Sequence, residues 1–273
     1  MKAISYLLLI LMVYPFSQES QQFVGSTPAD SQVRQFLGIP ENVAVDFIRW
    51  KLDLKQDSYQ LNCSYGVGKP NTNGFEVEQR IAVRGDFEMR GTYYKIRNGE
   101  KELSFAVLNK NMLHPVDEKR KLIPGNGGFS YTLSSTSSLK SAEFSLRPKE
   151  DKLPPKMVFE GRTPCGELAT IIGLGRDCYK LKWRIIFYSD SVNGKPSHVE
   201  MMATGFRKDG LLKGDWVIVK SSDGRLMYRI KPETYDYQLD LLKADEGVLL
   251  FTDGKGNLLV GNADFSYTLN RVR

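Results

Sequence analysis

The most regular hydrophobic pattern in the chain lies between Cys178 and Tyr188. In this segment, CYKLKWRIIFY, apolar or aromatic side chains at every second position alternate mainly with charged ones. Successive side chains of a strand point to opposite faces, so the period of two predicts a strand with one buried face. The first half of the chain has a less regular counterpart. Its apolar positions change phase near Phe47, which predicts a β-bulge there.

Further short alternating segments follow, separated by turn signals. The second half predicts strands over 216–220, 226–230, 237–242, 248–251, 258–260 and 265–269. Asp223-Gly224 between two of these runs indicates a hairpin. About six to eight strands in roughly 115 residues are typical of a sandwich or a closed barrel. Helix signals are few: Asp30 and Gly38 flank a candidate short helix over 31–37, which we interpret as a loop or plug.

The chain contains one pattern twice. FVGSTP at 23–28 matches FEGRTP at 159–164, and FSYTL occurs at both 129–133 and 265–269. Both matches are separated by 136 positions, whereas the landmarks between them keep their order but are 123 to 133 positions apart. The different spacings indicate changes in loop length inside the units. Surface loops tolerate such changes, because extra loop length costs little free energy. The pattern therefore predicts two homologous folded units.

These units run over 20–137 and 156–273, and we expect each to be a small antiparallel β-barrel. The fold class is thus all-β, with two barrels in tandem. Residues 138–155 are rich in proline and mixed charges, which is typical of a linker. Within this linker, 143–147 is a candidate edge strand.

The N-terminus carries a targeting signal. Lys2 precedes an apolar run over 6–16, and a polar stretch begins at Ser17. The run is shorter than the roughly 20 residues that a membrane-spanning helix needs. It predicts a secretory signal peptide over 1–17, and hence an exported protein, periplasmic or extracellular, with no transmembrane segment after cleavage. The alternative is a segment kept as a membrane anchor.

Export makes disulfides permissible, and the chain has three cysteines, Cys63, Cys165 and Cys178. Pairing Cys165 with Cys178, which are 13 positions apart, would stabilise the fold by about 3 kcal/mol if the effect is entropic. Three buried thiols are the alternative.

The formal net charge of +6 raises the question of nucleic-acid binding. The densest basic run, Lys119 to Lys121, stands beside Asp117 and Glu118. A surface that follows a phosphate backbone needs more concentrated charge, so we expect no nucleic-acid partner.

Catalytic and metal-binding patterns are sparse. The chain has no GxSxG, P-loop or EF-hand sequence, and its two histidines, His114 and His198, stand in different repeats. Paired carboxylates such as Asp245-Glu246 lie at expected turns. We therefore predict no enzyme activity, no cofactor and no metal site. One set of soft ligands for copper could still converge: Cys165, Cys178, His198, Met201 and Met202.

The opening of the second unit resembles a known family. Gly161-Arg162-Thr163-Pro164-Cys165, followed by a loop and a long alternating strand, is similar to the start of the N-terminal domain of bacterial copper-resistance and envelope-stress lipoproteins of the NlpE type. Those domains open GxxPCxxC and form lipocalin-like barrels. The resemblance implies such a barrel and an envelope location. Leu168 replaces the second cysteine, Ala29 stands at the first position in the other repeat, and no lipidation cysteine is present, which argues against a working CxxC site.

Function follows from what the barrels contain. We expect an exported, non-catalytic binding or interaction protein of the cell envelope, whose partner is a small apolar ligand or an envelope protein. The alternative is copper handling or envelope-stress sensing. The interior of a barrel of about eight strands is either filled by side chains or holds one small ligand. Two units in tandem also allow a shared groove between them. If the second barrel is hollow, its inward side chains would line the pocket: Trp183, Ile185, Phe187, Trp216, Tyr228 and Tyr267.

Overall fold

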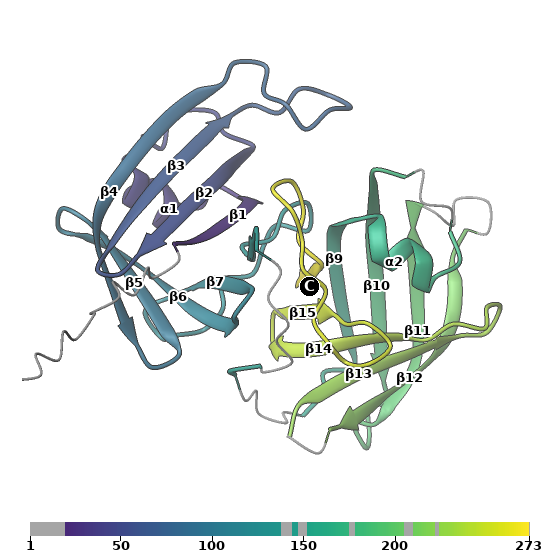
Figure 1. Cartoon of the computed structure of the whole chain (residues 1–273). Helices are drawn as coiled ribbons and strands as arrows, with labels where there is room; N and C mark the ends of the chain where they lie inside the picture. Colours follow the sequence, from purple (N-terminus) through teal and green to yellow (C-terminus); the bar gives the residue numbers. More distant parts are fainter. Residues whose placement is uncertain are drawn as a thin grey trace, which may run out of the picture.

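The computed structural model describes residues 20–137, 144–146, 152–174, 178–204, 210–221 and 224–272. The predicted signal peptide and most of the predicted linker lie outside these ranges. The described chain forms two closed antiparallel barrels of eight strands each, which confirms the predicted fold class (Figure 1). None of the described helices has the length and apolar character needed to cross a membrane.

The first barrel has its strands in chain order around the wall and closes by pairing β1 with β8. Its strands are β1 (Gln21–Thr27), β2 (Phe47–Lys55), β3 (Ser58–Gly66), β4 (Gln79–Arg90), β5 (Tyr93–Asn98), β6 (Lys101–Asn109), β7 (Met112–Val116) and β8 (Leu133–Ser135).

The second barrel repeats this order and closes by pairing β9 with β16. Its strands are β9 (Lys156–Pro164), β10 (Lys180–Ser189), β11 (Pro196–Ala203), β12 (Leu212–Lys220), β13 (Leu226–Pro232), β14 (Leu239–Asp245), β15 (Val248–Phe251) and β16 (Thr268–Arg271).

Each barrel carries one short helix after its first strand, α1 (Ser31–Leu37) and α2 (Gly166–Ile171). The Asp30 side chain caps α1 by accepting a hydrogen bond from the N–H of Val33 at 2.9 Å. Gly38 ends this helix with a φ of 75°, a left-handed conformation that glycine adopts without strain. The stretch interpreted as a loop or plug is thus helical in both repeats.

The predicted bulge near Phe47 and the predicted strand at 258–260 are wrong. β2 begins at Phe47 and pairs without interruption up to Lys55, so the phase change marks the start of a strand. In the second case Leu258 makes only an isolated bridge to Thr252. The described part of the candidate edge strand, 144–146, is not a strand either, although the N–H of Ser145 donates to the Leu108 carbonyl oxygen at 2.8 Å.

Matching contacts confirm that the two halves are repeats. The indole N–H of Trp50 donates to Thr27 Oγ1 at 2.8 Å, and that of Trp183 donates to Thr163 Oγ1 at 3.0 Å. In each barrel the tryptophan also pairs across the strands with the glycine of the FxGxTP motif. The repeated Trp, Gly and Thr therefore form one packing unit at the start of each barrel.

The barrels pack against each other through equivalent outer faces. In Figure 1, β6 and β7 of the first barrel lie towards β14 and β15 of the second. Ala106 and Leu108 on one side have Leu242 and Ala244 as their equivalents on the other, each pair 136 positions apart. The halves are therefore related by an approximate twofold axis, like the subunits of a symmetric dimer. The apolar cluster between them comprises Ala106, Leu108, Met112, Val116, Leu122, Phe144, Met227, Leu242, Ala244, Val248 and Leu250.

Hydrogen bonds across the interface are reciprocal. The N–H of Gly125 donates to Asn270 Oδ1 at 2.7 Å, and the N–H of Gly261 donates to Ser134 Oγ at 3.0 Å. Gly125 is equivalent to Gly261, and Ser134 to Asn270. Each repeat thus makes the same contact with the other, which fixes the barrels as one body.

The repeated FSYTL segments meet at this axis. The rings of Phe129 and Phe265 are stacked, with centroids 6.2 Å apart and planes 13° apart. In contrast, the Tyr131 side chain is buried in the first barrel, where its hydroxyl accepts from the N–H of Asp30 at 3.3 Å. The contact between the two copies gives a physical reason for their identity in sequence.

Candidate binding cleft between the barrels

The interior of the second barrel is occupied by the side chains that were candidates for lining a ligand pocket. The Phe187 ring centroid lies 4.8 Å from that of Trp216 and 5.4 Å from that of Tyr228. Trp183 packs against Phe251 at 5.2 Å. These rings are all buried and pack against one another inside the barrel.

The other two candidates belong to the same core. Ile185 is fully buried, and Tyr267 is buried close to the start of α2, where its hydroxyl interacts with the backbone of Glu167. Burial raises the pKa of the Tyr267 phenol. Trp183 lines a hollow of about 420 Å³ on the second barrel, whereas Ile185, Phe187 and Tyr267 do not line it. All six candidates belong to the buried core cluster of the second barrel.

The cysteines divide into a pair and a single thiol. Cys165 and Cys178 form a disulfide with their Cα atoms 5.6 Å apart. This bridge connects the N-terminus of α2 to the residues before β10. Cys63 is a buried free thiol on β3, and burial raises its pKa. A buried thiol with a raised pKa is unreactive.

The residues considered as soft ligands for copper contact different parts of the fold. His198 stacks on Tyr188 with ring centroids 4.3 Å apart, and Met201 is buried in the barrel core while Met202 is 41% exposed. Among the residues that the structure describes, no group of three or more His, Cys, Asp or Glu side chains is placed to hold a metal ion.

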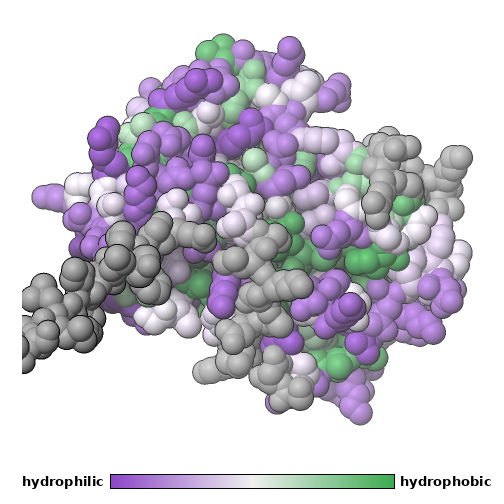
Figure 2. Space-filling model, viewed as in Figure 1, coloured by the Kyte–Doolittle hydropathy of each residue, from purple (hydrophilic) through white to green (hydrophobic). Residues whose placement is uncertain are grey.

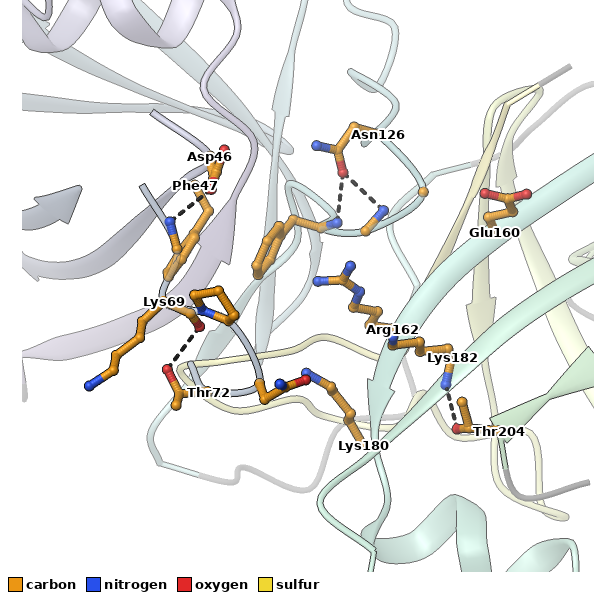
Figure 3. Close-up of a pocket in the computed structure, with 16 residues that line it drawn as sticks. Asp46, Phe47, Lys69, Thr72, Asn126, Glu160, Arg162, Lys180, Lys182 and Thr204 are labelled. Carbon is orange, nitrogen blue, oxygen red and sulfur yellow. Dashed lines mark hydrogen bonds between the residues drawn. The ribbon is translucent and has the colours of Figure 1, made fainter. Parts of the chain in front are cut away.

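A cleft of about 840 Å³ lies between the two barrels (Figure 3). The first barrel contributes the start of β2, the loop after β3 and the loop before β8. The second contributes the outer faces of β9 and β10 and the end of β11. Its lining residues are Asp46, Phe47, Gly68, Lys69, Pro70, Asn71, Thr72, Asn126, Gly127, Gly128, Phe129, Glu160, Arg162, Lys180, Lys182 and Thr204.

Three cations on adjacent strands dominate this lining. Arg162 on β9 pairs directly with Lys182 on β10, and Lys180 is two residues from Lys182 on the same face. We refer to these three residues as the cation triplet. Burial lowers the pKa of Lys180, and the charges of Arg162 and Lys182 lower it further, whereas the charge of Asp264 raises it. The three positive charges are therefore close enough to repel one another.

Aromatic rings lie beneath two of these cations. The Arg162 guanidinium carbon is 5.4 Å from the centroid of Phe129, and the Lys180 ammonium is 5.5 Å from that of Phe265. The partly exposed Phe129 ring also stacks on Phe47, with centroids 4.8 Å apart. The cleft thus combines positive charge with the faces of aromatic rings.

The acidic residues of the cleft have other partners. Glu160 forms an ion pair with Arg184, and Asp46 Oδ2 accepts a hydrogen bond from the N–H of Gly68 at 2.8 Å. No carboxylate of the described residues forms an ion pair with the cation triplet. The cleft consequently keeps an excess of positive charge.

Two further donors lie beside the cleft. Arg49 Nε and Asn73 Nδ2 are buried and have no hydrogen-bond partner within the described part of the chain. Both residues line a small cavity that shares Phe47, Phe129 and Arg162 with its larger neighbour. The volume of this cavity is only about 20 Å³, which is room for about one water molecule that could accept from these donors.

A second hollow, of about 920 Å³, lies on the first barrel beside α1, β5 and β6. Its charges are mixed, since Lys119 and Arg120 stand next to Asp117 and Glu118. Lys95 and Glu102 form an ion pair at 2.7 Å. Figure 2 shows one face of the molecule, which is hydrophilic over much of its area and has hydrophobic residues in separate patches. Both linings therefore carry both signs of charge, and the cleft differs in that the cation triplet has no ion-pair partner among the described residues.

Sequence reasoning missed the cation triplet. Lys180 and Lys182 alternate with core residues, and this pattern is typical of the solvent-exposed face of any half-buried strand. A comparison of the repeats could have found part of the signal, because Arg162 replaces Ser26 in an otherwise shared motif. The meeting of this face with the loop before β8 has no counterpart in the sequence pattern.

Comparison with known proteins gave no assignment. No protein-family model, no curated protein and no solved structure matches this chain significantly. The geometry of the cleft is therefore the basis for assigning a function to this chain.

Proposed function

We propose that this chain is a non-catalytic binding protein whose ligand is anionic and occupies the cleft between the barrels. The observation that carries the proposal is the cation triplet, for which the described residues supply no ion-pair partner. The packed aromatic interior of the second barrel supports it further, because a filled barrel favours recognition at the surface.

The energetics favour an anion at this place. Holding the three positive charges close together costs free energy. The attraction between a bound anion and these cations would offset this repulsion. A cleft with an excess of positive charge also concentrates anions and raises their rate of association. The volume of about 840 Å³ falls within the range of small-ligand sites.

The interface between the barrels supports binding in another way. The cleft walls come from two barrels held by a buried apolar cluster and by reciprocal hydrogen bonds. A cleft with fixed walls loses little conformational entropy when a ligand binds. The fixed relation between the barrels therefore favours a preformed site.

We assign this binding function to the cell envelope on the strength of the predicted signal peptide and of the resemblance to the NlpE type. No contact among the described residues favours the alternative of copper handling. The small apolar ligand expected inside a barrel is replaced by an anionic one between the barrels.

The test pairs charged probes with neutral ones. Triglutamate is compared with triglutamine, and trigalacturonate with maltotriose, by thermal shift and by calorimetry. We expect the acidic member of each pair to bind and its affinity to fall as salt is raised, because salt screens exposed charges. Neutral members that bind equally well would contradict the proposal.

Charge reversal provides the matched control. Lys180→Glu combined with Lys182→Glu should abolish binding of the acidic probes. Lys213→Glu combined with Lys220→Glu changes the net charge equally, on an exposed part of β12 that does not line the cleft, and should leave binding nearly intact. Equal losses in both double variants would mean that overall charge, and not the cleft, governs binding.

A further inference from the structure

The loops that precede the last strand of each barrel have the same conformation but different chemistry. The loop before β8 reads Gly-Asn-Gly-Gly-Phe, and the loop before β16 reads Gly-Asn-Ala-Asp-Phe. In both, the asparagine Oδ1 (Asn126 or Asn262) accepts from the backbone N–H groups two and three positions later, at 2.8 to 2.9 Å. Gly128 is therefore the structural equivalent of Asp264.

Asp264 neutralises a cation of the other barrel. Its Oδ1 lies 2.8 Å from an Nη2 of Arg49 on β2, and its Oδ2 accepts from the Tyr179 hydroxyl at 2.5 Å. A carboxylate supplied by the second barrel thus compensates the positive charge on the outer face of the first.

The equivalent cation in the other half has no such carboxylate. Strand pairing matches Arg49 with Ser26 and Lys182 with Arg162, so Lys182 is the counterpart of Arg49. Gly128 occupies the position from which an acidic residue, equivalent to Asp264, would face Lys182. A Cβ built on Gly128 would lie 3.5 Å from the guanidinium carbon of Arg162. The twofold relation between the halves therefore marks a position for one negative charge.

We propose that a carboxylate group of the ligand binds beside Gly128, in the place that the Asp264 carboxylate takes in the other half. This inference rests on the proposed function, and it adds the chemical class of the anion and its position within the cleft. Arg162 and Lys182 would hold the carboxylate, and the exposed part of the Phe129 ring would contact the group that carries it.

Glu160 does not fill this position. Its Oε2 would be 2.9 Å from a Cβ on Gly127, so it lies against the neighbouring residue, and its charge is paired with Arg184. A carboxylate from a peptide and one from an acidic sugar present the same group to Arg162 and Lys182. The two acidic probes, triglutamate and trigalacturonate, distinguish these sources.

The experiment places a carboxylate on the protein itself. Gly128 does not have a left-handed φ, so Gly128→Asp and the uncharged isostere Gly128→Asn both suit the backbone. We expect Gly128→Asp to melt at a higher temperature than Gly128→Asn at low salt, with a smaller difference at about 1 M NaCl. Gly254→Asp, in an open turn, controls for the added charge and should give no comparable rise.

Binding of the acidic probes gives the second measurement. Gly128→Asp should weaken it by about tenfold or more, because the new side chain repels and displaces the ligand carboxylate. Gly128→Asn and Gly254→Asp should stay close to the unchanged protein. Binding that favours inorganic phosphate over both carboxylate probes would overturn the choice of carboxylate.

The outcomes separate this inference from the proposed function. Equal probe affinity in Gly128→Asp and Gly128→Asn, or equal melting temperatures at low salt, would overturn the position beside Gly128. The proposed function would still stand if the Lys180→Glu, Lys182→Glu variant loses binding. If that variant also binds normally, both ideas fail.

Discussion

The hydroxyl of Thr268 donates to that of Thr132 at 2.9 Å, and these threonines are the same residue of the two repeats. In the first repeat, His114 extends this hydrogen-bond chain. Its Nδ1 lies 2.9 Å from Thr132 Oγ1, and its Nε2 lies 2.9 Å from the Ile123 carbonyl oxygen. A carbonyl only accepts, so Nε2 carries the proton and Nδ1 accepts from Thr132. Leu250 occupies the equivalent position in the second repeat, and the twofold relation is broken there.

This arrangement predicts that acid destabilises the protein through His114. The imidazole is fully buried, and burial lowers its pKa from 6.5 to about 4, although Ile123 and Asp245 act in the opposite direction. The unfolded chain binds a proton near pH 6.5 and the folded chain does not. The stabilising contribution is thus complete above pH 6.5 and is lost as the pH falls towards 4, by at most about 3 kcal/mol.

Urea unfolding at about pH 7.5 and pH 4.5 measures this loss. Carboxylates also titrate in this range, so the comparison is between variants. His114→Gln should show a smaller fall in unfolding free energy than the unchanged protein, and His198→Gln, at an exposed position, should show the full fall. An equal fall in both variants would rule out His114 as the source.

A second prediction concerns the hydrogen bond between Trp183 and Thr163. Thr163→Val keeps the shape of the side chain but leaves the indole N–H without an acceptor inside the barrel. We expect the free energy of unfolding to fall by about 1–3 kcal/mol, as measured in denaturant. Thr170→Val, at an exposed site on α2, should change it by less than about 0.5 kcal/mol. A similar small effect at Thr163 would contradict the assigned role.

A third prediction concerns the glycine of the FxGxTP motif. A Cβ on Gly161 would lie 2.5 Å from the Thr268 carbonyl oxygen and 2.9 Å from Leu269 Cδ2. Gly161→Ala should therefore destabilise the fold by about 1–3 kcal/mol, since β9 and β16 must separate. Gly254→Ala, where a Cβ meets nothing within 4 Å, should be neutral or slightly stabilising. Thermal unfolding of the two variants makes the comparison, and a neutral Gly161→Ala would refute the close approach.

A fourth prediction concerns the cooperativity of the two barrels. Leu242 is fully buried in the apolar cluster between them, so we expect the unchanged protein to unfold in one calorimetric transition. Leu242→Asp buries a charge in this cluster and should divide the transition into two. Leu211→Asp, at a residue that is 43% exposed, should keep a single transition. Two transitions in the unchanged protein would show that the interface does not couple the barrels.

The sequence predicted the barrels well where local patterns decide the structure. Alternation around Trp183 gave the buried row of β10, and Asp30 and Gly38 gave the ends of α1. Prediction failed at Phe47 and Leu258, where an apolar pattern was read as continuous strand. Whether such a segment pairs depends on a neighbouring strand that lies far away along the chain.

Most of the candidate site could not be predicted from the sequence. Trp216, Tyr228 and the other inward residues were identified as a set, but a list of inward side chains does not give the space left between them. That space depends on how the rings pack across the barrel, where Phe187 makes edge-to-face contacts with both Trp216 and Tyr228.

The amino-acid sequence by itself determined the strand rhythm and the duplication, because the first depends on neighbours in the chain and the second on a match between the halves. Only the tertiary structure decided that the barrels face each other across an approximate twofold axis and that Gly128 opposes Arg162. Electrostatic interactions depend on distance in space, and charges separated along the chain become one site only when two folded surfaces meet.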